Sequence, residues 1–401
     1  MAAMVTLTAV VGALGQKGHG ECWVWQRDND RVICVDAGRT LHVGVAGGRH
    51  RPQILILSHD DHDHIGGAVD LIRAAGVSLE QLWVPVEWAI LIKHLADAPD
   101  VDLLPDDLPQ TPPRIETLVA TQLVAAEDSG DHVATYGVEL HDLLVAAETT
   151  LADLAAERDR EGPPEASSEG VWRRWYGAAS RQEIVDRVRK RATRLIAILG
   201  EACRRSLTIR YFSIDLALRV GAKRSWLTAG IPGRVTIANA NEAPFWQAVQ
   251  IPPGIPYTYA LSRLTVQNRR ALSTLLWSHS RDTTQAVIVW SDSDGNWLNT
   301  LSPRGFTHVA GSLLASSAPH HASDNAAHAR VWQELAGAPQ RMVMICAGGQ
   351  GNQPYAAEYL VLASRRSCTR CRGHATPCQQ VTAHGGTGAG LTLQPPCAAS
   401  H

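Results

Sequence analysis

Residues 58–67 read Ser-His-Asp-Asp-His-Asp-His-Ile-Gly-Gly, and they directly follow the apolar run 54–57. Imidazole and carboxylate groups are the ligands that Zn²⁺, Mn²⁺ and Fe bind in proteins. The end of a rigid strand lets alternate side chains converge on one point. The stretch therefore predicts a metal site at the end of a strand.

The spacing inside this run selects the ligands. In extended backbone, alternate residues share one face, and a fourth ligand follows on the turn. The ligands predicted in this way are His59, Asp61, Asp63 and His64. Asp60 and His62 fall on the opposite face, where contact with solvent or with a ligand side chain is expected. A frame that uses His62 as a ligand stays open.

Further ligands must come from elsewhere, because sites with four or more ligands need them. Two later apolar runs also end in residues of the right type. The run 286–290 leads to Asp292, with Asp294 as its rival. The run 313–315 leads to His320 and His321, of which one is expected to be a ligand, with His320 favoured. Three such strand ends would line one edge of a sheet.

Sheet and helix patterns surround these runs. Apolar and β-branched residues predict strands over 6–11, 22–25, 31–35, 82–86, 208–214, 235–238, 257–261, 272–277, 286–290 and 342–347. Helical spacing predicts helices over 68–75, 140–160, 182–203, 325–336 and 355–365. The order strand, site, helix, strand in the first ninety residues is typical of a layered α/β fold.

The motifs resemble, in the same order, those of the metallo-β-lactamase fold, and in particular the nuclease domain attached to ComEC-type DNA-uptake channels. The run 59–64 is similar to the signature His-x-His-x-Asp-His, with Asp61 in place of the second histidine. Ser291-Asp292 stands where the family has Gly-Asp, and 319–323 where it has His-His-Gly-Ser. Further similar segments are 18–22, 32–38, 268–272 and 347–352.

The resemblance covers residues 5–90 and 257–362, and it implies a fold and a cofactor. The fold is of the α/β (α+β) class, a four-layer αββα sandwich formed by residues 1–365, with a helical insertion over about 140–206. Two divalent metal ions are implied, Zn or Mn, with Mg possible. One ion would take His59, Asp61 and Asp292. The other would take Asp63, His64, Asp292 and one of His320 or His321.

The implied activity is that of a metal-dependent hydrolase, a phosphodiesterase or nuclease acting on DNA or RNA. Two cations would lower the pKa of a bridging water, and Asp63 would orient the resulting hydroxide and take its proton. Asp61 in place of histidine makes the site more anionic, which favours Mn²⁺ or Mg²⁺. Hydrolysis of a small ester, lactone or cyclic nucleotide is the alternative. A non-catalytic binding or scaffold module with a structural metal is an alternative of another class.

Residues 171–205 contain ten Arg or Lys against three acidic residues. The common explanation is the solvated face of an amphipathic helix. The functional alternative is a grip on the phosphate backbone of a nucleic acid by Arg187, Arg189 and Lys190. Residues 366–401 hold Cys, Gly, Pro and Thr without periodicity and are expected to be a disordered tail; a small zinc site around Cys368 is the alternative.

The whole-chain charge is −2, from 37 basic and 39 acidic residues, so only a local patch could recognise a nucleic acid. No run is long and apolar enough to span a membrane, and no membrane partner is expected. The apolar start, 1–15, has no preceding positive charge and is interpreted as leading into a first strand rather than as a secretory signal. Eight scattered cysteines favour a reducing cytoplasmic location.

Overall fold

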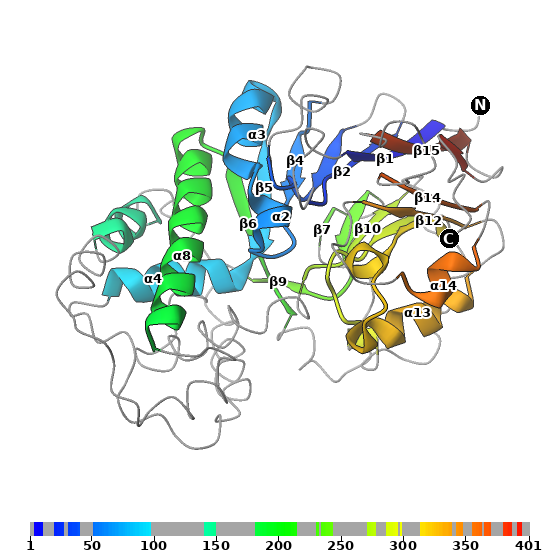
Figure 1. Cartoon of the computed structure of the whole chain (residues 1–401). Helices are drawn as coiled ribbons and strands as arrows, with labels where there is room; N and C mark the ends of the chain where they lie inside the picture. Colours follow the sequence, from blue (N-terminus) through cyan, green and yellow to red (C-terminus); the bar gives the residue numbers. More distant parts are fainter. Residues whose placement is uncertain are drawn as a thin grey trace.

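A computed structural model describes a large part of the chain, in segments that form one body (Figure 1). The described residues are 4–10, 20–27, 31–40, 51–97, 140–149, 181–214, 230–231, 234–243, 271–277, 286–295, 297–298, 313–338, 342–347, 355–362, 365–369, 380–386 and 391–394. The strand expected over 257–261 and the end of the helix expected over 140–160 lie outside these residues.

Within the described residues, the larger of two mixed sheets has nine strands. In spatial order they are β16 (Thr392–Gln394), β15 (Gln380–Gly386), β1 (Met4–Val10), β2 (Trp23–Arg27), β3 (Ile33–Val35), β4 (Ile54–Ile56), β5 (Gln81–Pro85), β6 (Thr208–Ser213) and β9 (Asn241–Ala243). The strands β3 to β6 are parallel, and the other neighbours are antiparallel. The parallel block brings the carboxyl ends of β3 and β4 to the same edge.

The second sheet has seven strands in the part of the chain that the structure describes. Their order is β14 (Arg366–Cys368), β13 (Val343–Cys346), β12 (Leu313–Ser317), β11 (Ala286–Val289), β10 (Thr274–Trp277), β8 (Val235–Ile237) and β7 (Gly230–Ile231). The strands β11 to β14 are parallel. A backbone hydrogen bond from Leu272 to Ser58 ties the second sheet to the first beside the end of β4.

Side chains of each strand alternate between two cores, as period-two patterning requires. In β4, Ile54 and Ile56 enter the core between the two sheets, whereas Leu55 faces the helices on the other side. In β11, Val287 enters the same inter-sheet core and Ile288 faces away from it. Burial of such a side chain stabilises the fold by about 1.5–3 kcal/mol. Both sheets are therefore covered on both faces.

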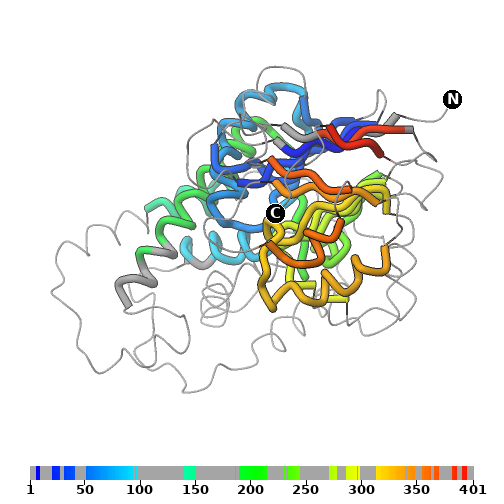
Figure 2. The backbone as a smooth tube through the Cα atoms, turned by 45° about the vertical axis from the view of Figure 1, so that its right-hand side comes forward, coloured from blue at the N-terminus to red at the C-terminus, as the bar shows by residue number. Residues whose placement is uncertain are grey.

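Helices cover the outer face of each sheet (Figures 1 and 2). On the larger sheet these are α3 (Ala68–Ala75), α4 (Val86–Asp97), a helix over 140–149 and α8 (Arg181–Arg204). On the smaller sheet they are α13 (Ala329–Ala336) and the short α14 (Ala357–Leu360). No helix among the described residues is long and apolar enough to cross a membrane.

Most expected elements are confirmed, as is the mixed α/β character of the fold. The helix expected over 68–75 is α3, and it ends at Gly76, whose φ of 59° is accessible to glycine at little cost. The helix expected over 182–203 is α8. The helix expected over 355–365 is shorter, because α14 ends at Leu360 and β14 begins at Arg366.

The prediction of a disordered tail over 366–401 is wrong for its described residues. Residues 380–386 form β15, which pairs with β1 along its whole length, and β16 extends the sheet by one more strand (Figure 2). Leu391 and Leu393 are buried in the inter-sheet core. These strands consist largely of small and polar residues, so the sequence carries little hydrophobic alternation to reveal them. The domain boundary drawn at residue 365 therefore cuts through both sheets.

Candidate metal centre

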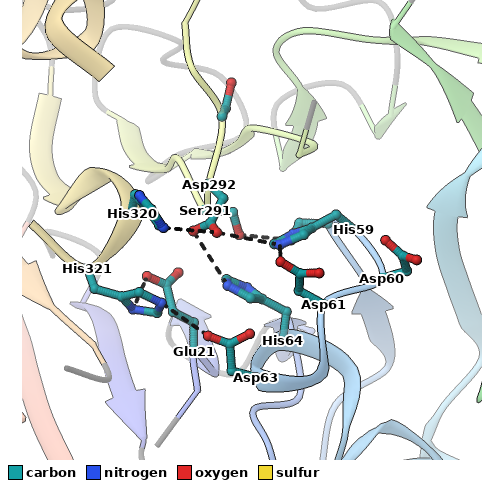
Figure 3. A network of polar contacts seen from close by, with 12 residues as sticks. Glu21, His59, Asp60, Asp61, Asp63, His64, Ser291, Asp292, His320 and His321 are labelled. Carbon is teal, nitrogen blue, oxygen red and sulfur yellow. Dashed lines mark hydrogen bonds and ion pairs between the residues drawn. The ribbon is translucent and has the colours of Figure 1, made fainter. Parts of the chain in front are cut away.

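The histidines and carboxylates gather where several strands end at one edge of the two sheets (Figure 3). Asp36 follows β3, the 57–61 loop follows β4, Asp292 follows β11, and His320 follows β12. These strands belong to parallel blocks, whose carboxyl ends meet at one edge. The three strand ends singled out in the sequence thus lie together, but β4 belongs to the larger sheet and β11 and β12 to the smaller one, whereas a single sheet was expected.

The local geometry of the first run differs from the extended backbone assumed for it. Asp61 is extended, with φ −69° and ψ 142°, but His62–Ile65 form a short helix, α2. Asp63 and His64 therefore reach the site from helical turns rather than from alternate positions of a strand. The Gly66-Gly67 pair lets the end of this turn pack closely on the 37–40 segment, because a Cβ at Gly66 would lie 2.4 Å from the carbonyl oxygen of Arg39.

His59, His64 and Asp292 form the most buried part of the centre. Nε2 of His59 lies 3.7 Å from Oδ2 of Asp292, and Nε2 of His64 lies 3.6 Å from Oδ1. His320 approaches the same carboxylate, with Nε2 3.6 Å from Oδ2. These three residues, His59, His64 and Asp292, each offer a ligand atom within 4.8 Å of the other two, and such a group could hold a metal ion.

The polar atoms of this group test whether a cation fits. Nε2 of His59, Nε2 of His64 and Oδ1 of Asp292 are buried and make no hydrogen bond to the described residues. A buried polar atom without a partner costs about 1–3 kcal/mol. One cation would satisfy all three atoms at once, because imidazole nitrogen and carboxylate oxygen are both metal ligands. The donor set thus fits a divalent metal.

The four imidazoles share one orientation. Each Nδ1 lies within hydrogen-bonding distance of a fixed group: His59 with Ser58 Oγ at 2.8 Å, His64 with Asp36 Oδ2 at 2.8 Å, His320 with Ser323 Oγ at 3.1 Å and His321 with the Ala347 carbonyl at 2.9 Å. A donated Nδ1–H leaves the lone pair on Nε2. All four rings therefore present Nε2 to the centre, as metal-binding histidines do.

Asp36 is the carboxylate whose hydrogen bonds position the buried histidines. Its Oδ2 accepts hydrogen bonds from Ser58 Oγ at 2.8 Å and from Ser291 Oγ at 2.6 Å, besides its contact with His64. Its Oδ1 accepts the backbone N–H of Ser58 at 2.7 Å. Through Ser58 the same carboxylate orients His59. The contact of Asp36 with His64 was not predicted from the sequence.

Asp63 and His321 form a second group with His64. Oδ2 of Asp63 lies 3.3 Å from Nε2 of His321, and these three residues again offer atoms within 4.8 Å of one another. His321 is the more buried of the two adjacent histidines, whereas the sequence favoured His320. The structure brings both histidines to the centre, His320 beside Asp292 and His321 beside Asp63 and Glu21 (Figure 3).

Glu21 belongs to the centre but was not predicted. It is fully buried, its Oε2 accepts a hydrogen bond from the Trp23 indole at 3.0 Å, and its Oε1 lies 3.2 Å from Nδ1 of His321. With Asp292 and His321 it forms another group able to hold a metal ion. Its position directly before the buried strand β2 was the available signal, because a carboxylate there must find a partner inside.

Asp61 lies at the rim of the centre. Its carboxylate is 3.8 Å from Nε2 of His59 and accepts a hydrogen bond from Arg191 Nη2 at 3.3 Å. Among the described residues, neither Asp61 nor Asp294 belongs to a converging group of metal-ligand atoms. The predicted ligand Asp61 therefore lies near the site, but its carboxylate also pairs with Arg191.

Charge coupling decides the protonation of the buried groups. Burial alone would raise the pKa of the Asp292 carboxyl, but His64 and the neighbouring imidazoles hold that pKa well below its ordinary value. Burial would lower the pKa of His64, but Asp36, Asp292 and Asp63 raise it well above the ordinary value. Asp63 likewise has a lowered pKa, because His64 and His321 outweigh the effect of burial. Without a metal, the centre is a set of carboxylates balanced by protons on imidazoles.

The loops that carry Asp292 and the two histidines have unusual backbone. Ser291 has φ 50°, and His320, His321 and Ala322 have φ values of 42°, 54° and 65°. Residues other than glycine rarely adopt this region, at a cost of about 1–3 kcal/mol each. A hydrogen bond from His320 N to the Ser291 carbonyl, at 3.0 Å, joins the two loops. The surrounding contacts therefore hold these ligand-type residues in a strained backbone conformation.

The three residues proposed for a nucleic-acid grip belong to the first half of α8. Lys190 is exposed, and Arg189 lies 3.9 Å from Asp186 on the same helix. The side chain of Arg187 is outside the described residues. For Lys190 and Arg189, the described contacts do not include the metal centre.

Comparison of the chain with protein-family models, with curated proteins and with solved structures finds no match.

Proposed function

We propose that the chain is a metal-dependent hydrolase of the metallo-β-lactamase fold that cleaves phosphodiester bonds, with nucleic acid as the substrate. The convergence of His59 Nε2, His64 Nε2 and Asp292 Oδ1, three buried atoms without hydrogen bonds to described residues, is the observation that carries the proposal. Such a set is costly unless a cation completes it.

Two features of the fold support the assignment to this family. Two facing sheets with helices on their outer faces are what a four-layer αββα sandwich requires. Ser291 and Ala322, which stand at the glycine positions of the family motifs, both have positive φ. The backbone that glycine favours is thus kept at both positions although the glycines are not.

Two divalent cations, Zn²⁺ or Mn²⁺, would supply an activated water and neutralise charge that builds up on the attacked phosphate. His59, His64, His320 and Asp292 would hold one of them, and Asp63, His321 and Asp292 the other, with Asp61 at the rim. Asp292 is favoured as the shared carboxylate, because His59, His64 and His320 lie within 3.7 Å of it and His321 belongs to a group with it.

Asp63 is the group proposed to take the proton from the attacking water. Its lowered pKa keeps it ionised, and 38% of its side chain is exposed, so a water can reach it. His321 lies 3.3 Å away and would stabilise the charge of Asp63. The Glu21 carboxylate in turn holds the imidazole of His321 in place.

The test combines metal analysis with a substrate panel. The purified protein should contain Zn or Mn, and with added Mn²⁺ it should cleave DNA, RNA or a small phosphodiester such as bis(p-nitrophenyl) phosphate. Asp63→Ala should abolish cleavage, whereas Asp70→Asn, on the exposed face of α3, should not. Cleavage of esters or lactones without any phosphodiester would replace the proposed substrate class. Absence of both metal and hydrolysis would overturn the proposal.

A further inference from the structure

Two arginines of α8 reach the loop that carries His59. Nη2 of Arg191 lies 3.3 Å from Oδ1 of Asp61, and its Nη1 lies 3.7 Å from Oδ2 of Asp60. Nη1 of Arg194 donates a hydrogen bond to the Asp60 carbonyl oxygen at 3.0 Å. The residues are three apart, so they lie on the same face of the helix. That face is turned toward the rim of the metal centre.

The rest of α8 fixes these two side chains in position. Ala192, Leu195 and Leu199 are buried in the core shared with α3 and α4, on the outer face of the larger sheet. Near the end of the helix, Glu201 accepts hydrogen bonds from Arg73 of α3 at 3.1 Å and from Arg205 at 2.8 Å. The helix is thus packed beside the sheet (Figure 1) rather than projecting from it.

The arginine contacts leave donors for another partner. A guanidinium has five N–H donors in a fixed fork, and the contacts of Arg191 with the two carboxylates use only its two Nη atoms. Its side chain is 22% exposed, at the same rim as Asp61. A neutral substrate gains little from such a group, whereas a phosphate accepts strong charge-assisted hydrogen bonds from it.

We propose that Arg191 and Arg194 form an anion-recognition rim that selects substrates with a phosphate group beside the scissile bond. The inference rests on the proposed function and deepens it, because it assigns the substrate class to contacts of α8. It also moves the phosphate contact from Arg187, Arg189 and Lys190 to Arg191 and Arg194, which follow them on α8 and touch the 57–61 loop.

The rim has two electrostatic effects of opposite sign. A positive charge beside Asp60 and Asp61 repels a divalent cation and attracts an anion. Removal of the charge should therefore tighten metal binding and weaken phosphate binding. Damage to the fold would weaken both metal binding and phosphate binding. Opposite changes in the two affinities therefore distinguish a role in recognition from a purely structural one.

The experiment uses the full chain and the variants Arg191→Gln, Arg194→Gln and Arg191→Lys, with Lys190→Gln as the matched control. Lys190 is exposed on the same helix, so its substitution removes the same charge without a contact at the rim. Titration calorimetry measures Mn²⁺ binding to the metal-free protein and then inorganic phosphate binding at saturating Mn²⁺. Thermal melting checks that each variant is folded.

For each arginine-to-glutamine variant we expect Mn²⁺ affinity to rise several-fold and phosphate affinity to fall about tenfold or more. Arg191→Lys should lose less phosphate affinity, because it keeps the charge but not the fork. Lys190→Gln should change either affinity by less than about twofold, because salt screens an exposed charge. If an arginine variant does not fold, Arg191→Lys and the salt dependence of phosphate binding to the unmodified protein carry the test.

Unchanged phosphate affinity in both arginine-to-glutamine variants, loss of both affinities together, or an equal effect of Lys190→Gln would each overturn the inference. Failure of the proposed function gives a different result: Mn²⁺ and phosphate would bind with the expected arginine dependence, yet no phosphodiester would be cleaved. If the protein hydrolyses phosphodiesters but its phosphate affinity is the same in both arginine-to-glutamine variants as in the unmodified protein, the anion-recognition rim is overturned and the proposed function is not.

Discussion

Asp36 and His64 are joined by a 2.8 Å contact between Oδ2 and Nδ1, in a site where both side chains are fully buried. The same carboxylate accepts hydrogen bonds from the hydroxyls of Ser58 and Ser291. One acid at the end of β3 therefore positions side chains from three segments. The ligand-type residues are thus oriented by a carboxylate that contacts Nδ1 of His64, whereas Nε2 of the same ring lies beside Asp292. Their preorganisation depends on this buried acid.

Asp36→Asn is expected to weaken divalent metal binding by about 10–100-fold, because outer carboxylates of this kind fix the tautomer of metal-binding imidazoles. The amide is close in shape but cannot accept from Ser58, His64 and Ser291 together. A Zn²⁺ or Mn²⁺ titration of the folded variant measures the effect. Asp70→Asn serves as the control, and equal affinities for the two variants would argue against the role of Asp36.

Metal binding should release protons and weaken as the pH falls. In the metal-free protein Asp36, Asp292 and Asp63 raise the pKa of His64 against the opposing effect of burial, so His64 is still protonated around neutral pH. A metal needs the neutral imidazole and must displace that proton. Calorimetry in buffers of different ionisation enthalpy would count the protons released. Binding that is independent of pH between about 6 and 8 would contradict the raised pKa of His64.

Glu201 is expected to make the protein sensitive to acid. Arg205 and Arg204, with Arg73 of α3, lower the pKa of its carboxyl from 4.5 to about 2. A lowered carboxyl pKa gives stability that is fully present above the unfolded value and is lost as pH falls toward the folded value. Glu201→Gln should cost about 1 kcal/mol of unfolding free energy at pH 7 and less near pH 2. Urea denaturation at both pH values checks this, and an equal cost at both would rule it out.

Leu393→Ala is expected to destabilise the protein by about 2 kcal/mol or more, because Leu393 of β16 is buried in the inter-sheet core. If residues 391–394 were part of a disordered tail, this substitution would not change the free energy of unfolding. Thr392→Ala, on the exposed side of the same strand, is the matched control. Comparison of the midpoints of urea unfolding distinguishes the two cases.

The ligand-type residues that the sequence singled out are those at which chemistry and hydrophobic pattern coincide. The 59–64 run, Asp292 and the 320–321 pair each follow an apolar run, and the structure brings them to one edge. Glu21 and Asp36 were harder to assign, since a single acid beside a strand is common and its partner, His321 or His64, is remote in sequence. Their role arises from tertiary contacts alone.

The arrangement within the 59–64 run could not be read from spacing either. Alternation assumes extended backbone, whereas the chain turns into α2 directly after Asp61, and Gly66 and Gly67 let the end of that turn pack against the backbone of Arg39 and Thr40. The pairing of Arg191 with Asp61 was likewise hidden, because it joins residues 130 apart. Local pattern carries no information on which basic residue of a long helix meets a distant loop.

The pairing of β1 with β15 has a consequence for the order of assembly. Thr8 and Thr382, whose hydroxyls lie 3.3 Å apart, are separated by 374 residues. During synthesis β1 must wait over this separation of 374 residues before its neighbour β15 exists, which at about 5–20 residues per second takes tens of seconds. Through that interval one side of β1 is an open strand edge, available to other nascent chains. The larger sheet is therefore completed long after β1 is made, and the delay gives aggregation time to compete with folding.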